Sequence, residues 1–259
     1  MELVSLLHIL SYMIIIGSII AAIVLAFVVV QKTLLVDEVK IFFKEDSAIA
    51  PRLLKKCKML VTEQGNIDLQ VKYDYPLFWG TNATAQNVFA AYNRPVQSFA
   101  CKREELVDPE SPEHLFMDWI ESDSKTPEAC VLVFPGHTGT IDSLYVRGMV
   151  AILKTKYKVV VYNRPGCGKN KLKSHMFFLH PTVTTISAIV NYVSQTLNNS
   201  MPIMLVGFSL GGNNVMRYLG DLHDKHKVND KVIGALVSCP IYDPEATTKE
   251  LAKNQTYDK

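Results

Sequence analysis

The protein has 259 residues, of which 48% are hydrophobic, 20% charged and 9% aromatic, and this composition excludes a disordered, collagen-like or coiled-coil chain. Its 27 Lys and Arg against 25 Asp and Glu leave a net charge of +2, which gives no indication of a nucleic-acid partner. The five cysteines are scattered without CxxC spacing, and no phosphate-binding glycine motif is present. We therefore expect no disulfide framework, no metal site and no cofactor.

The amino-terminal segment is predicted to anchor the protein in a membrane. The 29 residues from 3 to 31 include no Asp, Glu, Lys or Arg, and a helix needs roughly 20 apolar residues to cross a bilayer. The alternatives are a buried core helix and a cleaved signal peptide, but a signal peptide has a basic start and a shorter apolar stretch. We assign residues 1–31 as a single transmembrane helix of the endoplasmic reticulum or plasma membrane, and residues 32–75 as a juxtamembrane stalk.

The orientation of this segment is left open by the sequence. Basic residues follow it, the first of them Lys32, and the positive-inside rule then places the carboxyl side in the cytoplasm. Glycosylation sequons begin at Asn82, Asn198 and Asn254, and such sites are usable only in a lumenal chain. The two signals point in opposite directions.

From residue 114 onward, strand-like apolar runs alternate with helix-like segments. We predict strands at 114–120, 130–134, 158–162, 202–206 and 232–238, and helices at 141–155, 183–197 and 213–222. Thr182 is the expected cap of the second helix. Continuous apolar runs such as residues 130–134 suit strands that are buried on both faces. The alternation predicts an α/β domain, placed at residues 76–259, with a mostly parallel sheet covered by helices on both faces.

The segment Gly207-Phe-Ser-Leu-Gly211 fits the pattern G-x-S-x-G between a predicted strand and a predicted helix. That context is typical of a nucleophile elbow rather than of a plain glycine-rich turn. Gly207 and Gly211 leave room for a tight turn. The turn places the Ser209 hydroxyl at the carboxyl edge of the sheet and at a helix amino terminus, which favours developing negative charge. We predict that Ser209 is the nucleophile of an acyl-transfer reaction.

The loop that follows the strand at 130–134 is predicted to complete an oxyanion hole. Acyl transfer needs two N–H donors, and one is expected from Leu210, the residue after the nucleophile. The second is expected from the backbone of His137 in the loop Pro135-Gly-His-Thr-Gly139. A catalytic role for the His137 side chain is the alternative.

Four motifs together resemble a known family: GFSLGGNNVMRYLG (207–220), FPGHTGT (134–140), VVVYNRPGCG (159–168) and YPLFWG (75–80). They are similar to the membrane-anchored alpha/beta-hydrolase-domain proteins of the AB hydrolase 4 family, which holds monoacylglycerol lipases and medium-chain phospholipases. The resemblance covers about residues 40–243. It implies the alpha/beta-hydrolase fold, a Ser–Asp–His hydrolase of lipid carboxylic esters with Ser209 as nucleophile, and a membrane and a lipid ester as partners.

The expected partners of Ser209 depart from that family. In this fold the acid and the histidine follow the serine, and the only later histidines are His223 and His226. They lie at the far end of the predicted helix, roughly 21–25 Å away at 1.5 Å per residue. Carboxylates after the last strand are predicted to be solvated loop charges (Asp243, Glu245 and Glu250). We therefore expect that the catalytic acid and histidine are not in this chain, and that it ends where the second half of the hydrolase should continue.

Three interpretations follow from this pattern. The chain is a truncated product of a lipid esterase, or a catalytically inactive membrane protein with a lipid-binding or interaction role, or an enzyme with a different base such as His175 or His180. An additional downstream strand with an Asp and a later His would indicate the first. The sequence leaves the acyl chain, the head group and the oligomeric state undetermined.

Overall fold

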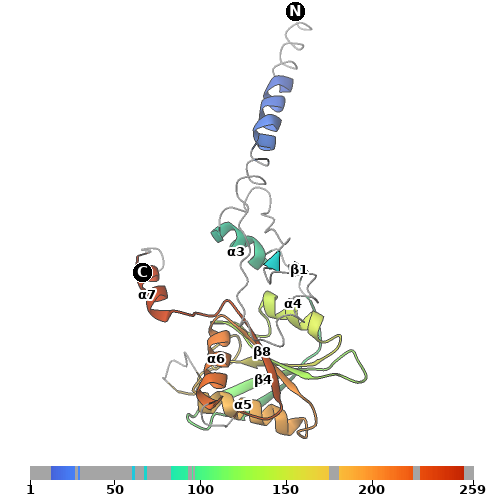
Figure 1. The fold of residues 1–259 in the computed structure, drawn as a ribbon, viewed down its shortest axis with the longest axis vertical. Coiled ribbons are helices and arrows are strands. Elements are labelled where there is room, and N and C mark those ends of the chain that lie inside the picture. Colours follow the sequence, from blue (N-terminus) through green and yellow to red (C-terminus); the bar gives the residue numbers. More distant parts are fainter. Residues whose placement is uncertain are drawn as a thin grey trace, which may run out of the picture. The chain divides into compact units, whose positions relative to one another are not determined.

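The computed structural model describes residues 13–26, 29, 60–61, 67–68, 83–92, 95, 97–174, 181–223 and 228–253 (Figure 1). The chain forms two compact units, Met1–Tyr92 and Asn93–Lys259. The predicted boundary between stalk and domain, at residues 75 and 76, lies outside the described residues.

The first unit contains a helix at residues 13–26, a two-stranded antiparallel sheet of β1 (Leu60–Val61) and β2 (Ile67–Asp68), and α3 (Ala83–Tyr92). Among the described parts of the chain, no helix has the length and hydropathy needed to cross a membrane. Residues 1–12, 27–28 and 30–31 of the predicted span, and all of the predicted stalk except residues 60–61 and 67–68, lie outside the described residues. The transmembrane helix thus stays a prediction.

The second unit is built on a six-stranded sheet in the order β3-β4-β6-β5-β7-β8. Its strands are β3 (Lys102–Val107), β4 (His114–Ile120), β5 (Cys130–Phe134), β6 (Lys158–Asn163), β7 (Ile203–Phe208) and β8 (Val232–Ser238). The four strands from β6 to β8 are parallel, whereas β3 and β4 are antiparallel at one edge. The prediction of a mostly parallel sheet is confirmed.

The edge strand β3 is the strand of this sheet that the sequence did not predict. Four of its six residues are charged, in the order Lys-Arg-Glu-Glu-Leu-Val, so no apolar run or clear alternation marks it. An edge strand has one neighbour, and its residues here are exposed or half-buried. Polar side chains are therefore tolerated at positions where a central strand would require apolar ones.

Helices cover both faces of the sheet, as predicted (Figure 1). On one face, α4 (Leu144–Leu153) buries Val146 and Val150 against the sheet. On the other, α5 (Val183–Thr196) and α6 (Leu210–His223) pack against β5 and β7. All five residues of β5 are buried. The predicted cap is also confirmed, because the Thr182 hydroxyl accepts the Thr185 N–H at 3.1 Å.

The segment after β8 differs from the prediction of a loop. Residues Pro244–Ala252 form a helix, α7, which no helical pattern of apolar residues in the sequence indicated. Asp243 is its N-cap and accepts the Ala246 N–H at 2.8 Å, and Pro244 occupies the first turn, where its missing N–H costs nothing. Glu245 and Glu250 are exposed and pair with lysines of the same segment. The carboxylates are solvated as predicted, but their assignment to a loop is wrong.

A buried carboxylate fixes the segment that follows β6. Glu113 has no exposed surface, and its oxygens accept hydrogen bonds of 2.6–3.2 Å from the Lys173 N–H, the Ser174 N–H and the Ser174 hydroxyl. Burial disfavours the ionised form, but the hydrogen bonds from Ser174 and Lys173 outweigh it, so the pKa of Glu113 is lowered from its ordinary value. The ionised carboxylate therefore stabilises the fold at neutral pH.

Replacing Glu113 with Gln is expected to lower the free energy of unfolding at neutral pH by about 1–3 kcal/mol, because the amide satisfies fewer of these donors. Since the folded-state pKa is lowered, the stabilisation is present above the unfolded pKa, about 4.3, and is lost as pH falls through the folded-state pKa. Thermal melts should show a Tm difference between wild type and Glu113→Gln that shrinks in acid. The exposed Glu128, changed to Gln, is the control. A difference that is equal at neutral and acid pH would contradict this role.

Candidate active site

Ser209 occupies a strained turn between β7 and α6. Its φ of 49° lies in the left-handed region, which residues with a Cβ rarely adopt and which costs of order 1–3 kcal/mol. The surrounding backbone holds it there, since the Ser209 N–H donates to Ser238 O at 2.8 Å and the Asn213 N–H donates to Ser209 O at 3.1 Å. Such strain is typical of a nucleophile elbow. The predicted turn is confirmed, and the side chain is half-buried.

The two predicted elbow glycines are required by packing. A Cβ on Gly207 would lie 2.6 Å from Gly211 O and from Gly212 Cα. A Cβ on Gly211 would lie 2.0 Å from Phe134 O, at the end of β5. The first turn of α6 therefore lies against the end of β5 at a distance that no side chain permits.

The loop after β5 contacts Ser209, as the prediction of an oxyanion hole requires. A Cβ on Gly136 would lie 3.3 Å from Ser209 Cβ. His137, the next residue, has an exposed side chain, and Leu210 is the first residue of α6. Within the described part of the chain, no acceptor takes the N–H of His137 or of Leu210. The first N–H groups of a helix have no intrahelical acceptor and carry a partial positive charge. Both predicted donors thus lie on the two segments that flank the serine.

The histidines are placed at several distances from the serine. Because α6 runs without interruption from Leu210 to His223, His223 lies roughly 21 Å along the helix from Ser209 at 1.5 Å per residue. The His114 ring contacts the Glu105 carboxylate at the outer strands. His175, His180 and His226 lie outside the described residues. Of the histidine side chains that the structure describes, His137 is the one on a loop that contacts the serine.

Residues 130–256 match the family model described as the alpha/beta hydrolase fold. This segment contains β5, the loop of His137, the elbow and α6. Residues 130–256 are an alpha/beta-hydrolase domain. The resemblance that the motifs predicted is thereby confirmed at the level of the family.

The chain is similar to two named enzymes. It is 26% identical over 161 residues to phospholipase ABHD3 of Homo sapiens, which covers 58% of this chain and 38% of that protein. It is 27% identical over 207 residues to monoacylglycerol lipase ABHD2 of Mus musculus, covering 76% of this chain and 45% of that protein. The chain thus spans less than half the length of either relative.

The chain is also similar to a solved structure. The Pyrococcus furiosus esterase Pf2001 aligns with a TM-score of 0.47 and 20% identity, over 61% of this chain and 59% of that one.

Asn213, the last residue of GFSLGGN, has a structural role in the hydrolase domain that sequence reasoning did not identify. Its side chain donates to Ile241 O at 2.7 Å and accepts the Ile241 N–H at 3.0 Å. The pair of bonds ties the segment after β8 to the first turn of α6. An amide side chain supplies one donor and one acceptor together, which a carboxylate or hydroxyl does not match as well. The motif continues past the elbow at residues 207–211 to Asn213, and this extension was the signal for its role.

A buried polar network supports the loop between β5 and α4, which contains His137. Asp118, on β4, has no exposed surface and accepts two hydrogen bonds from Arg103, at 2.7 and 2.6 Å. It also accepts one from Asn163 Nδ2 at 2.8 Å, and Asn163 Oδ1 accepts the Ile141 N–H at 2.8 Å. The network therefore links three strands to the loop between β5 and α4. A lone Asp within the apolar run His114–Ile120 was the signal that the sequence offered.

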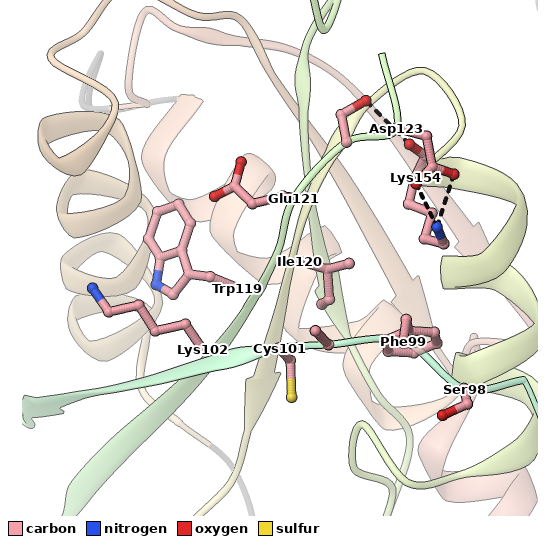
Figure 2. Close-up of a pocket in the computed structure, with 11 residues that line it drawn as sticks. Ser98, Phe99, Cys101, Lys102, Trp119, Ile120, Glu121, Asp123 and Lys154 are labelled. Atoms are coloured by element: carbon pink, nitrogen blue, oxygen red, sulfur yellow. Dashed lines mark hydrogen bonds and ion pairs between the residues drawn. The ribbon is translucent and has the colours of Figure 1, made fainter. Parts of the chain in front are cut away.

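A cavity of about 450 Å³ lies beside the end of β4, and Figure 2 shows the side chains that line it. It is lined by the end of β4, where Ile120 pairs with Val159 at the start of β6. Ser209 follows the carboxyl end of the parallel strands, which are about five residues or 17 Å long at 3.3 Å per residue. Lys154 and Asp123, which also line the cavity, form an ion pair of 2.6 Å. This cavity is separate from the candidate active site.

Replacing Gly211 with Ala is expected to destabilise the domain by at least about 3 kcal/mol, because the new Cβ would overlap Phe134 O. The matched control is Gly220→Ala in the same helix, where nothing lies within 4 Å of the new Cβ. That change should be neutral or stabilising by up to about 1 kcal/mol, because Ala favours a helix over Gly. Chemical denaturation measures both. Equal effects of the two substitutions would refute the packing argument.

Proposed function

We propose that this protein is a serine hydrolase of carboxylic esters, with Ser209 as the nucleophile. The single observation that carries the proposal is the Ser209 backbone, at φ 49° between β7 and the amino terminus of α6. Strain of this kind is retained where the surrounding structure enforces it and a function uses it. The N–H groups of His137 and Leu210 on the flanking segments, which have no acceptor among the residues that the structure describes, give the site its second element.

The chemistry that this arrangement suits is acyl transfer in two steps. The Ser209 oxygen attacks the ester carbonyl while a histidine takes the hydroxyl proton. The carbonyl oxygen becomes an oxyanion, which the N–H groups of His137 and Leu210 stabilise. The C–O bond to the alcohol breaks as the alcohol takes the proton from the histidine. Water then hydrolyses the acyl-enzyme by the reverse sequence and releases the acid.

Lipid esters are the proposed substrate class. Two relatives are named phospholipase and monoacylglycerol lipase, and both names describe hydrolysis of lipids. The proposed membrane segment supports the same class, because it would hold the domain beside its substrate. Monoacylglycerols or phospholipid acyl esters are therefore the substrates to test.

A catalytically inactive lipid-binding protein is the second candidate. The observation that favours it is the length of α6, which separates His223 from Ser209 by about 21 Å. A serine hydroxyl without a base is a poor nucleophile at neutral pH.

Fluorophosphonate labelling and hydrolysis of p-nitrophenyl butyrate test the role of Ser209. The 259-residue chain is expected to react weakly, because a serine hydroxyl without a base is a poor nucleophile, and Ser209→Ala is expected to abolish the labelling and the hydrolysis that passes through the serine. The roughly 10³–10⁴-fold acceleration over water that the oxyanion hole and binding give alone should remain in Ser209→Ala as the background. Added imidazole is expected to raise the rate by supplying the base. Ser238→Ala, a nearby serine whose backbone oxygen supports the elbow, is the control that should retain activity.

The alternatives give different results in the same assay. Strong labelling without imidazole, lost in Ser209→Ala, would identify a base within the chain, and His137→Ala, His175→Ala and His180→Ala would locate it. No Ser209-dependent reaction with or without imidazole, combined with binding of lipid vesicles, would replace the hydrolase by the lipid-binding protein.

Residues 1–31 are proposed to anchor the protein in the membrane. The helix at residues 13–26 exposes apolar side chains along its length, from Met13 to Leu25. Its Ser18 hydroxyl bonds to Ile14 O at 2.8 Å, so this polar group is satisfied within the helix. A helix that is apolar on all sides suits a lipid environment better than water.

Carbonate extraction tests the anchor. The full chain is expected to stay in the membrane pellet, and a chain without residues 1–31 should be released. Recovery of the full chain in the supernatant would refute the anchor. Orientation is read from the same preparation, because a mobility shift that a glycosidase reverses would place the domain in the lumen. Asn198→Gln tests an exposed sequon at the end of α5, and Asn82→Gln tests the sequon nearer to the anchor.

A further inference from the structure

We propose that Tyr145 and Arg164 are positioning residues of the oxyanion hole, which together fix the orientation of the peptide group that carries the His137 N–H. The inference rests on the proposed function, since it names the side chains that prepare the same site for the reaction. Both act through Gly136, the residue that contacts Ser209.

Tyr145 holds the amino side of Gly136. Its hydroxyl oxygen accepts the Gly136 N–H at 2.9 Å. The Tyr145 ring packs edge-on against Phe208, with ring centroids 5.0 Å apart, and Phe208 immediately precedes Ser209. Burial raises the pKa of Tyr145, although the Gly136 N–H opposes the shift, so the phenol stays protonated at neutral pH. One side chain from the first turn of α4 thus connects the loop to the elbow.

Arg164 holds the carbonyl side of Gly136. It follows β6, is only 6% exposed, and donates from Nη2 to Gly136 O at 3.1 Å. The Gly139 N–H donates to the same oxygen at 3.0 Å. Burying a guanidinium is costly unless its N–H groups are bonded. Placing one against a backbone carbonyl beside the nucleophile therefore favours a positioning role over a general contribution to the core.

The geometry of the peptide bond connects these contacts to His137. The Gly136 carbonyl and the His137 N–H belong to one planar trans peptide group, in which they point in opposite directions. Fixing the carbonyl therefore fixes the direction of the N–H. A glycine would otherwise leave this peptide free to rotate, and a Cβ on Gly136 would be crowded, at 3.3 Å from Ser209 Cβ. The two side chains restrict the rotation that glycine alone would allow.

Tyr145→Phe is the first test, with Tyr218→Phe as matched control. The Tyr218 hydroxyl also accepts a backbone N–H, from Asn229 at 3.1 Å, but at the other end of α6. Ser209-dependent hydrolysis of p-nitrophenyl butyrate by the full chain is expected to lose about 10- to 100-fold in kcat in Tyr145→Phe, with KM unchanged, which is less than the ~10²–10³-fold for complete loss of a donor. Tyr218→Phe should keep the kcat of the wild type.

Hydrogen exchange read by mass spectrometry gives a result that does not depend on activity. In Tyr145→Phe, a peptide that spans residues 134–140 is expected to gain one rapidly exchanging amide. In Tyr218→Phe the same peptide should exchange as in the wild type.

Arg164 is tested by comparing two substitutions. Arg164→Met removes the donor and is expected to lower kcat by about 10²-fold. Arg164→Lys keeps a donor and a positive charge and should recover part of the loss. If Arg164→Met does not fold, the kcat of Arg164→Lys relative to wild type, together with the Tyr145→Phe result, still tests the positioning role.

The outcomes separate this inference from the proposed function. A wild-type chain whose hydrolysis depends on Ser209, with kcat and exchange unchanged in Tyr145→Phe, would overturn the positioning role and leave the hydrolase standing. An equal loss of kcat in Tyr145→Phe and Tyr218→Phe would also overturn it. A chain without any Ser209-dependent reaction would overturn both proposals.

Discussion

The close packing of the first turn of α6 against the end of β5 is the constraint on which the candidate active site depends. Gly211 lies so near to Phe134 O that no Cβ can be accommodated there. This contact sets the angle at which the chain leaves β7, and the turn is completed with Ser209 in a left-handed conformation. Strain at the serine is thus compensated by packing and by the hydrogen bonds of the adjacent backbone.

The sheet makes this contact possible because β5 and β7 are parallel neighbours. Their pairing brings Phe134 beside Gly207, so the loop after β5 and the elbow after β7 emerge at the same edge. β5 itself is buried on both faces by α4 on one side and by α5 and α6 on the other. A strand fixed in this way by apolar contacts gives the loop of His137 a rigid base.

Polar side chains fix the loops around the elbow, which the apolar core does not hold in place. The loop between β5 and α4 is bonded to Asn163 and through it to Asp118, and its Gly136 is bonded on both sides by Tyr145 and Arg164. The segment after β8 is bonded to Asn213. A buried polar group is costly when unpaired. Networks of this kind therefore stabilise one arrangement of the loops over its alternatives.

The sequence by itself determined the apolar strands, the helices between them and the position of the elbow. A continuous run such as Cys130–Phe134 is fully buried as expected, because hydrophobic period and glycine spacing are local properties of the chain. It did not determine β3 or α7. The charged residues of an edge strand lack a period, and the cap of Asp243 precedes a helix with no buried residue.

Only the tertiary structure decided which distant residues support the serine. Asp118, Arg164 and Asn213 come from separate elements. Arg164 and Asn213 bond directly to segments far from them in sequence, and Asp118 acts on its loop through Asn163. Hydrogen bonds of this kind depend on distances between elements, which strand order and helix packing set after the local structure has formed. The sequence therefore named Ser209, Gly207 and Gly211, whereas the side chains that fix the loops around them required the assembled sheet.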